Sequence, residues 1–511
     1  MSELKFGTAG LRAKVGPGPD EMNVGTATRA TAGVAAWLQE RKRPLRADGV
    51  FRAAVGYDAR YGSHALARAT AETFAGAGFD VTLIAEPAPT PVLAWLVKSR
   101  RMDVGVQITA SHNPAQDNGY KLYLDGGSQL VSPADRQIEE HIAAQPADAA
   151  DIPRSEAKSV DLSAVSGYVT DLGTLVATGR QSELAPRRKL KILYTPMHGV
   201  GGNALEWALR ENGFGNVHTV ASQRWPDPNF PTVAFPNPEE PGATDALLAE
   251  AREIDADLLI ALDPDADRCM LGLKRADGEY HMLRGDETGP LLARRVLAGV
   301  GASPGNKPVV ATTVVSSQLL GRMARAEGWD YVETLTGFKN LARAADGRPG
   351  ELAFAYEEAI GTAPAPHIVA DKDGIATALI AAAWAAETDL AAELENIEAT
   401  YGVFRTAQVS SRFEDVAQAH ELIERWTKNP PATLAGAAVQ AGPIEDSEGN
   451  RTDGVRLVGH VDDLALRVVA RASGTEPKAK FYLEVSAEPG ADAQAVEALL
   501  ERLKVDVSGA V

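Results

Sequence analysis

One pattern of apolar and polar positions occurs three times along the chain. Each copy has a short apolar run, a polar loop, a stretch with apolar residues at helical spacing, a glycine followed by an aromatic residue, and a second apolar run. Glycine ends a helix without the steric cost of a Cβ atom, and short apolar runs are typical of strands covered on both faces of a sheet. The pattern predicts three strand–helix–strand units, at residues 53–58, 64–77 and 81–84, then 191–194, 203–212 and 217–220, then 308–312, 318–327 and 331–334.

A further apolar strand follows each unit and leads into a polar loop of a different chemical kind. The loops begin, in chain order, at Ser111, Asp263 and Glu357-Glu358, after predicted strands at residues 104–108, 258–262 and 352–355. In open parallel sheets, ligands bind at the carboxyl ends of the strands, so three equivalent domains facing one central cleft would each contribute one loop. The alternative is three independent α/β domains whose loops never meet.

The end of the chain departs from this pattern. Short alternating strands are predicted at residues 403–409, 454–457, 465–470 and 479–485, with helices at 415–427 and 492–504. The segment 225–242 is too rich in proline for a helix or a central strand and is predicted to be a surface loop. We expect an α/β fold of three similar domains with mixed, mainly parallel sheets and a smaller C-terminal α+β domain, with domains at 1–155, 156–283, 284–400 and 401–511.

Composition and charge narrow the possible partners. The chain has 511 residues and a formal net charge of −18, which disfavours non-specific attraction to nucleic acid or to anionic lipid. We find no signal segment and no run of about 18 apolar residues that would span a membrane, so the cytoplasm is the expected compartment. Cys269 is the only cysteine, which excludes an intramolecular disulfide, and it is expected to be a small apolar filler.

The strongest chemical signal is the run Asp-Pro-Asp-Ala-Asp-Arg at residues 263–268. Three carboxylates on alternate residues converge if the backbone curls, and convergence requires a cation. Mg²⁺ prefers hard oxygen ligands, and three carboxylates leave room for a phosphoryl oxygen as a further ligand. A calcium loop of the EF-hand type fits poorly, because Arg268 and Lys274 stand where such a loop has glycine and glutamate. A nucleophilic Asp263 and a solvated acidic loop are the other interpretations.

A serine follows the first of the three loop-bearing strands, within Thr-Ala-Ser-His-Asn-Pro at residues 109–114. By itself Ser111 fits a helix cap or a turn. His112 can exchange a proton near neutral pH, and Lys121 can hold an anion or tune a neighbouring acid or base. A phosphoserine carries about −1.5 to −2 charges, which a cation at the aspartate loop would neutralise.

Further basic and hydroxyl residues suit a phosphate. Residues 471–478, Arg-Ala-Ser-Gly-Thr-Glu-Pro-Lys, combine a guanidinium, two hydroxyls and a glycine in one turn, although a charged surface turn is the alternative. Glu357 and Glu358 can accept hydrogen bonds from sugar hydroxyls or be solvated. Thr-Gly-Phe-Lys at residues 336–339 ends another strand and offers a cation, and Gly-Thr-Ala-Gly-Leu-Arg at residues 7–12 is a glycine-bearing loop with an arginine.

In their order along the chain, these motifs and Glu-Glu-Ala-Ile-Gly at residues 357–361 resemble the α-D-phosphohexomutase superfamily, which contains phosphoglucomutases and phosphomannomutases. The resemblance spans nearly the whole chain. It implies four domains around one cleft, with a mobile C-terminal domain. It also implies a phosphosugar substrate, a cytoplasmic monomer or homodimer, Mg²⁺, and a sugar 1,6-bisphosphate as intermediate and activator.

The same resemblance implies roles for single residues. Ser111 corresponds to the serine that is phosphorylated in the resting enzyme, and Asp263, Asp265 and Asp267 correspond to the Mg²⁺ ligands, beside the phosphate on Ser111. Residues around the transferring phosphate and its proton movements correspond to Arg12, His112, Lys121, Arg268 and Lys339. The loop that holds the other substrate phosphate corresponds to Arg471, Ser473, Gly474, Thr475 and Lys478, and Glu357 corresponds to a sugar-hydroxyl ligand.

One departure concerns the sugar. Many relatives have serine two residues after the glutamate that corresponds to Glu357, whereas this chain has Ala359. The Glu-Glu-Ala-Ile-Gly loop resembles a branch with phosphopentomutase-like members, so both a hexose and a pentose remain candidates. A phosphoserine-dependent phosphatase and a non-catalytic sugar phosphate-binding protein are the rival functions.

Overall fold

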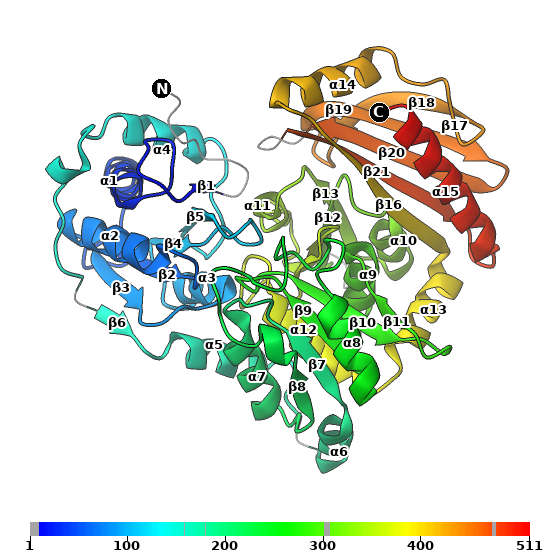
Figure 1. The fold of residues 1–511 in the computed structure, drawn as a ribbon, viewed down its shortest axis with the longest axis horizontal. Helices are drawn as coiled ribbons and strands as arrows, with labels where there is room; N and C mark the ends of the chain where they lie inside the picture. Colours follow the sequence, from blue (N-terminus) through cyan, green and yellow to red (C-terminus); the bar gives the residue numbers. More distant parts are fainter. Residues whose placement is uncertain (1–9, 158, 179, 301–306, 473–476) are drawn as a thin grey trace. The chain divides into compact units, whose positions relative to one another are not determined.

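Four sheets are formed by the residues that the computed structural model describes, namely 10–157, 159–178, 180–300, 307–472 and 477–511. The chain divides into two compact units. The first contains Met1–Arg284 and Ala359–Thr388, and the second contains Gly285–Glu358 and Asp389–Val511. Figure 1 labels their helices and strands.

The first sheet of the first unit is mixed. Its strands, in spatial order, are β1 (Leu11–Lys14), β5 (Asp117–Leu124), β4 (Val104–Ile108), β2 (Arg52–Tyr57), β3 (Asp80–Ile84) and β6 (Ser159–Asp161). Only β5 runs antiparallel to its neighbours. The core on one face is closed by α1 (Val24–Arg41) and α2 (Ser63–Gly76), while α3 (Thr90–Ser99) packs on β2 and β4, and α4 (Ala134–Ala143) packs on α1. A short 3₁₀ helix spans Ala149–Asp151.

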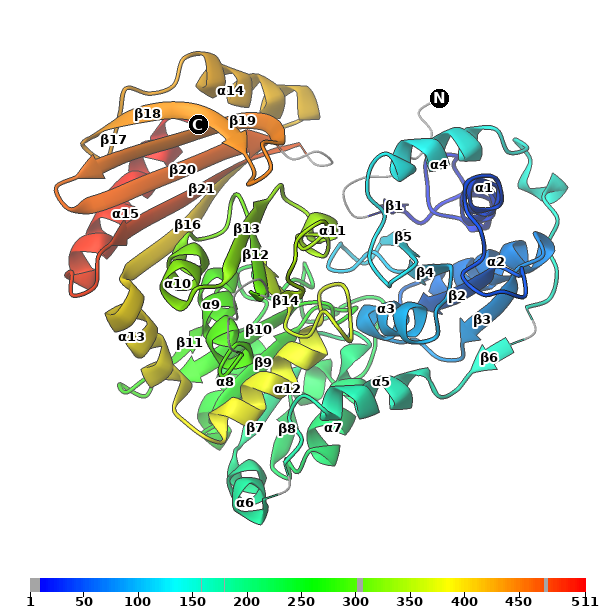
Figure 2. The ribbon, with the colours of Figure 1, turned by 180° about the vertical axis from the view of Figure 1, so that it is seen from behind.

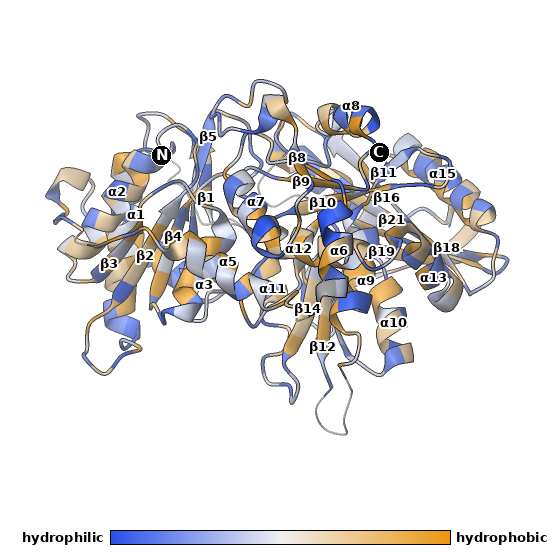
Figure 3. Ribbon diagram, turned by 90° about the horizontal axis from the view of Figure 1, so that it is seen from below, coloured by the Kyte–Doolittle hydropathy of each residue, from blue (hydrophilic) through white to orange (hydrophobic). Residues whose placement is uncertain are grey.

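The second sheet of the first unit is also mixed. Its strands, in spatial order, are β11 (Tyr280–Met282), β10 (Cys269–Lys274), β9 (Leu258–Leu262), β7 (Ile192–Thr195) and β8 (Val217–Thr219). The central strand β9 reads Leu-Leu-Ile-Ala-Leu, is buried throughout and is strongly hydrophobic in Figure 3. Because both of its faces are apolar, helices cover both sides. They are α8 (Asp245–Ile254) on one face, and α7 (Gly201–Glu211) and α12 (Gly374–Ala385) on the other.

The remaining described elements of the first unit are three helices and one short strand. They are α5 (Ala164–Gly173), α6 (Gln181–Lys189), a 3₁₀ helix at Ala221–Gln223 and β15 (Gly361–Ala363). Helix α5 packs against both α3 and α7 and therefore joins the two halves of the unit.

The second unit combines a parallel sheet and an antiparallel sheet. The parallel strands are β13 (Asp330–Thr334), β12 (Val309–Thr313) and β14 (Leu352–Glu357), which pack with α9 (Gly285–Val296), α10 (Leu319–Glu327) and α11 (Phe338–Leu341). The antiparallel strands are β16 (Val403–Arg412), β21 (Lys478–Ala487), β20 (Leu464–Ala472), β19 (Arg451–Val461), β18 (Ala437–Glu445) and β17 (Thr433–Leu434). The core of the antiparallel sheet is closed by α14 (Val416–Lys428) and α15 (Ala493–Gly509). Helix α13 (Leu390–Tyr401) comes directly before β16 in the chain (Figure 2).

The expected fold class is confirmed: three α/β domains with mixed and parallel sheets are followed by an additional C-terminal antiparallel domain. The three repeated helices correspond to α2, α7 and α10. The glycine expected after each helix has a positive φ, of +87° at Gly78, +89° at Gly213 and +79° at Gly328. None of the described helices is by itself both long and apolar enough to cross a bilayer.

The junction of α3 and α5 gives a test of how closely the two halves of the first unit are packed. A Cβ atom on Gly167 of α5 would lie 2.5 Å from the buried ring of Trp95, whereas a Cβ on Gly173 of the same helix would make only ordinary contacts, from 3.5 Å outward. We expect Gly167→Ala to lower the free energy of unfolding by about 1–3 kcal/mol, because the packed ring must shift. Gly173→Ala is the matched control and should leave it unchanged or raise it by up to about 1 kcal/mol. Urea denaturation of both variants measures the difference, and equal behaviour would contradict this close packing.

Candidate active site

Two loops that each follow a buried strand meet inside the first unit. One follows β4 and contains Ser111, and the other follows β9 and begins at Asp263. Ser111 Oγ donates a hydrogen bond of 3.0 Å to Asp263 Oδ2, and both residues are buried. The fold therefore brings the candidate serine and the first candidate aspartate into direct contact, although they stand 152 positions apart along the chain.

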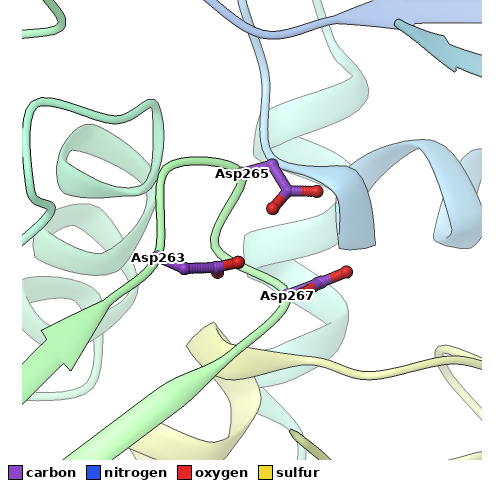
Figure 4. Close-up of side chains that lie close together, drawn as sticks. All are labelled: Asp263, Asp265 and Asp267. Atoms are coloured by element: carbon purple, nitrogen blue, oxygen red, sulfur yellow. The ribbon is translucent and has the colours of Figure 1, made fainter. Parts of the chain in front are cut away.

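The aspartate loop curls tightly between β9 and β10. Ala266 lies in the left-handed region at φ +56°, and its N–H donates to the carbonyl oxygen of Asp263 at 2.9 Å. This turn brings the alternate carboxylates together. Asp263, Asp265 and Asp267 each offer an oxygen within 4.8 Å of the other two, with the side chains directed to a common region (Figure 4).

Close backbone packing holds this loop. A Cβ atom at Gly199, in the loop after β7, would lie 2.3 Å from the Cα of Pro264, so only glycine fits there. The next residue, Val200, donates its N–H to the carbonyl oxygen of Pro264 at 2.8 Å. On the other side, a Cβ at Gly374, the first residue of α12, would lie 2.5 Å from the carbonyl oxygen of Arg268. The aspartate loop is thus clamped between two segments.

The buried negative charge of the trio is balanced by lysine. Lys121 Nζ lies 2.6 Å from Asp265 Oδ2 and 2.7 Å from Asp267 Oδ2, and Lys372 Nζ lies 3.5 Å from Asp267 Oδ2. Burial acts to raise the pKa of Asp267, but Lys121 and Lys372 outweigh it and hold that pKa below its usual value. Asp263 is farther from the compensating ammonium groups, and burial together with its two acidic neighbours raises the pKa of Asp263 well above the usual range.

The donor set fits a hard divalent cation. The oxygens Asp265 Oδ1 and Asp267 Oδ1 are buried, and neither has a hydrogen-bond partner among the described residues. A buried carboxylate oxygen without a partner is costly, and a cation that prefers oxygen ligands removes this cost. These residues therefore fit the Mg²⁺ expected from the sequence.

The serine loop is held by an arginine that the sequence analysis did not identify. Ser111 has a left-handed backbone at φ +54°, and its N–H donates to Thr109 Oγ1 at 2.9 Å. The buried Arg60 donates to four backbone carbonyl oxygens of this loop, those of Ser111 at 2.5 Å, Asn113 at 2.6 Å, Pro114 at 2.8 Å and Asp117 at 3.2 Å. Arg60 thus fixes the shape of the loop through its main chain.

Two of the predicted residues near the serine differ in what they contact. His112 Nδ1 lies 3.3 Å from Ser111 Oγ, and burial, reinforced by Arg268 and Arg12, lowers the pKa of His112 well below its usual value. The imidazole is therefore neutral at pH 7. Arg12, on β1, donates from Nη1 to Asn113 Oδ1 at 3.1 Å.

Arg268 ends the aspartate loop. Its N–H donates to Asp263 Oδ1 at 3.0 Å, and its Nη1 lies 3.8 Å from Glu239 Oε2. The following residue, Cys269, is buried and begins β10, where its N–H donates to the carbonyl oxygen of Ile360 at 3.2 Å. Burial raises the pKa of the Cys269 thiol.

The other predicted residues belong to the second unit or lie outside the described residues. Arg471 Nη1 donates to Thr336 Oγ1, which joins the C-terminal domain to the Thr-Gly-Phe-Lys segment. Lys339 lies in the short helix α11, and Lys478 begins β21. Ser473, Gly474 and Thr475 lie outside the described residues.

Glu357 ends β14, Glu358 follows it directly, and the two residues differ in their surroundings. Glu357 is buried, whereas Glu358 accepts hydrogen bonds from Thr313 Oγ1 at 3.2 Å and Ser316 Oγ at 3.3 Å. The same segment, residues 313–318, binds the C-terminal domain, because Arg467 Nη1 donates to the carbonyl oxygen of Val314 at 3.2 Å. One short segment therefore contacts both the candidate sugar loop and the C-terminal domain.

Arg60 and Lys372 are the clearest residues that sequence reasoning missed. Arg60 had a usable signal, because Asp58 and Arg60 place opposite charges directly after a predicted strand. Lys372 lies between Asp371 and Asp373, a charged run that no predicted strand precedes, so nothing in the sequence pointed to the site.

Comparison with known proteins finds one family along three parts of the chain. The family described as "Phosphoglucomutase/phosphomannomutase, alpha/beta/alpha domain" matches this chain in three parts. Domain I matches residues 3–148, domain II matches residues 166–277 and domain III matches residues 284–401.

Individual proteins are similar over most of the chain. A Haemophilus influenzae protein named "Probable phosphomannomutase" is 37% identical over 452 residues, which cover 86% of this chain and 90% of that protein. The phosphopentomutase of Homo sapiens is 31% identical over 536 aligned positions, covering 96% of this chain and 86% of that protein. A crystal structure from Thermus thermophilus, provisionally named a phosphomannomutase, has a TM-score of 0.76 at 24% identity and covers 99% of this chain and 100% of that chain. This last likeness concerns the fold.

The buried lysine gives a prediction for the metal-free protein. In Lys121→Met, Asp265 and Asp267 lose their closest cation while remaining buried, so we expect the free energy of unfolding in EDTA to fall by about 3–5 kcal/mol. Saturating Mg²⁺ should restore a larger part of the stability of this variant than it adds to the wild type, because the aspartates of the variant keep more uncompensated negative charge for the cation to neutralise. Calorimetry with EDTA and with Mg²⁺ measures both effects.

Lys14→Met is the matched control, since Lys14 is an exposed lysine on β1 that pairs with β5, the strand that carries Lys121. It should change neither value. Equal Mg²⁺ responses of the wild type and Lys121→Met would show that Lys121 and the metal do not neutralise the same carboxylates.

Proposed function

The chain belongs to the phosphoglucomutase/phosphomannomutase family, and from this premise we propose that it interconverts hexose 1-phosphates and hexose 6-phosphates through a phosphoserine at Ser111. It is a phosphosugar mutase, an isomerase that works by phosphoryl transfer. The phosphoserine, the bisphosphate intermediate and the residue roles below are the proposal.

One observation carries the proposal: a buried serine hydroxyl lies 3.0 Å from a buried aspartate trio that fits a divalent cation. A phosphate on Ser111 would bring about −1.5 to −2 charges and three acceptor oxygens into this site. Such a group is stable there only if positive charge is close. The candidate Mg²⁺ site, Arg12, Lys121 and Arg268 supply it.

The first half of the reaction breaks the bond between phosphorus and Ser111 Oγ and forms a bond from phosphorus to the free hydroxyl oxygen of the sugar 1-phosphate. The sugar hydroxyl loses its proton, and Ser111 Oγ regains one. His112 is suited to take or return this proton, since it is neutral and its Nδ1 is 3.3 Å from Ser111 Oγ. The product of this half is a sugar 1,6-bisphosphate.

The second half runs in the opposite sense with the sugar turned around. The other phosphoryl group of the bisphosphate moves to Ser111 Oγ, and the sugar 6-phosphate leaves. No phosphate is lost in the cycle, and the serine ends as it began. The bisphosphate therefore serves both as the intermediate and as the activator that phosphorylates Ser111.

Asp263, Asp265 and Asp267 would hold the metal, and the phosphate on Ser111 would be a further ligand. When bound, Mg²⁺ supplies electrostatic stabilisation of the charge on the phosphoryl oxygens. Lys121 then holds Asp265 and Asp267 in place from the side of β5.

In the proposal, residues of the second unit bind the part of the substrate that does not react. Arg471, Ser473, Gly474, Thr475 and Lys478 would bind the distal phosphate, Glu357 would accept a hydrogen bond from the sugar, and Lys339 would add a cation. We further propose that the protein acts in the cytoplasm as a monomer or homodimer, with phosphosugars as its partners and without nucleic acid or membrane.

A phosphopentomutase is the second candidate. The human protein of that name is similar over 96% of this chain, and Ala359 stands in the sugar loop where many relatives have serine. In this version ribose or deoxyribose 1-phosphate is the substrate, and the serine chemistry is unchanged.

The central residue is tested by Ser111→Ala. The variant should lose turnover by a factor of at least about 10⁴, because a group that forms the covalent intermediate has no substitute. A coupled isomerase assay measures turnover, and peptide mass spectrometry of freshly purified wild type should find one phosphate, on Ser111. Near-normal rates in Ser111→Ala, or a phosphate on another residue, would contradict the proposal.

The sugar is tested by comparing kcat/KM for the 1-phosphates of glucose, mannose, ribose and deoxyribose, each primed with the matching bisphosphate. We expect the hexose phosphates to be turned over faster. A preference of tenfold or more for a pentose phosphate would establish the second candidate instead. Release of inorganic phosphate in the same reactions would identify a phosphatase, and binding without exchange of label between the two phosphate positions would identify a non-catalytic binding protein.

A further inference from the structure

A strained aromatic residue stands next to the candidate active site. Phe230 belongs to the proline-rich segment 225–242, which is a loop as expected, yet its side chain is buried, with 4% of its surface exposed. Its backbone has a φ of +48°, in the left-handed region that a bulky residue rarely adopts. Strain of this kind persists where the surroundings enforce it, and it concentrates at functional sites. The contacts of Phe230 and its neighbours indicate what this strain maintains.

The ring of Phe230 packs against Arg60. The guanidinium carbon of Arg60 lies 4.9 Å from the centroid of the ring, a cation–π contact between two buried side chains. Asp58 Oδ2 lies 3.2 Å from Arg60 Nε on the same guanidinium. Because the other two nitrogens bind the carbonyls of the serine loop, the ring holds in place the group that shapes the backbone around Ser111.

The same loop also reaches the segment that supports the aspartates. Asp227 donates its N–H to the carbonyl oxygen of His198 at 2.9 Å, and Thr232 Oγ1 lies 2.8 Å from His198 Nε2. His198 is buried and itself left-handed at φ +59°. Two residues further on, Val200 donates its N–H to the carbonyl oxygen of Pro264 in the aspartate loop.

A third contact joins the loop to the domain that carries Ser111. Tyr61, next to Arg60, donates from its hydroxyl to Asn229 Oδ1 at 3.2 Å. Residues 227–232, which we name the bracket loop, therefore contact Arg60 and Tyr61 on one side and His198 on the other.

We propose that the bracket loop sets the distance between Ser111 and the aspartate trio, with Phe230 as a positioning residue for phosphoryl transfer and Thr232 as a positioning residue for the metal ligands. The inference rests on the proposed function and deepens it. None of the loop's residues touches the reacting atoms; they act through Arg60 and His198. A displacement of about 1 Å between reacting groups costs on the order of 100-fold in rate, so a loosened bracket should slow the chemical step rather than weaken sugar binding.

The first arm is tested with Phe230→Ala, Phe230→Leu and Phe230→Tyr. Leucine retains an apolar side chain without a π face, and tyrosine keeps the ring. We expect kcat, and the single-turnover rate of phosphoryl transfer from phosphorylated Ser111, to fall about 10- to 100-fold in the alanine and leucine variants. KM should change less than threefold, and tyrosine should restore at least half of the rate.

Trp225→Ala is the matched control. Trp225 is an aromatic residue of the same proline-rich segment with its ring under Arg224, but it is 67% exposed and lies outside the bracket loop. This variant should keep the wild-type rate. A purely structural role of Phe230 would instead lower the melting temperature while leaving kcat unchanged at temperatures where the protein is folded.

The second arm is tested with Thr232→Val and Mn²⁺ as the probe. Manganese binding to the dephosphorylated protein, followed by electron paramagnetic resonance, should weaken, because the segment from His198 to Val200 that supports Pro264 loses its contact with Thr232. Trp225→Ala should bind Mn²⁺ like the wild type. This readout needs no turnover and no sugar.

The outcomes separate the inference from the proposed function. Wild-type protein that transfers no phosphoryl group from Ser111 would overturn the proposed function, and Mn²⁺ binding by Thr232→Val would still test the bracket loop. An active wild type together with an unimpaired Phe230→Leu would overturn the role of Phe230. Unchanged Mn²⁺ affinity in Thr232→Val would overturn the second arm.

Discussion

Three buried carboxylates on one short loop impose the constraint on which the rest of the first unit depends. Like charges cannot be buried together without compensation, so the aspartate loop needs cations from elsewhere in the fold. Lys121 comes from β5 and Lys372 from the segment before α12, and the ammonium groups of both form ion pairs with Asp267. The site thus links the two mixed sheets electrostatically, while the hydrogen bond from Ser111 to Asp263 joins them at the reacting position. The packing of the first unit and the proposed metal site therefore depend on the same aspartate and lysine charges.

The elements of the fold were predictable where the local sequence pattern and the burial of the element favour the same structure. The three glycine stops and the strands before the functional loops follow from short-range rules, because a strand buried on both faces must be apolar and a left-handed helix end favours glycine. Strands β17 and β18 were missed. The sequence of β18, Ala-Ala-Val-Gln-Ala-Gly-Pro-Ile-Glu, is poor in strand-forming residues, and its proline falls where the register with β19 shifts. Its place in the sheet is set by its neighbours, not by its own composition.

The residues of the candidate site likewise fall into those that the sequence pattern identified and those that it did not. Ser111 and the three aspartates were identifiable because they lie in loops that follow predicted strands, and ligands bind at the carboxyl ends of strands. Arg60, Lys372 and Phe230 act through partners far away in the sequence, as with Arg60 and Ser111 or Phe230 and Arg60. No local pattern encodes such pairs. The left-handed backbone of Phe230 is equally hidden, since proline on either side indicates a loop but not which residue of the loop bears the strain.

The single thiol of the chain has a practical consequence. Cys269 is buried directly after the aspartate loop, and burial disfavours its thiolate, which is the form that reacts with alkylating reagents and oxidants. The native protein should therefore tolerate oxidising conditions, while alkylation of Cys269 would report opening of β10 beside the site. Because the only cysteine of the chain is buried, a cysteine introduced at an exposed position can carry a thiol-specific spectroscopic probe without first removing a native one.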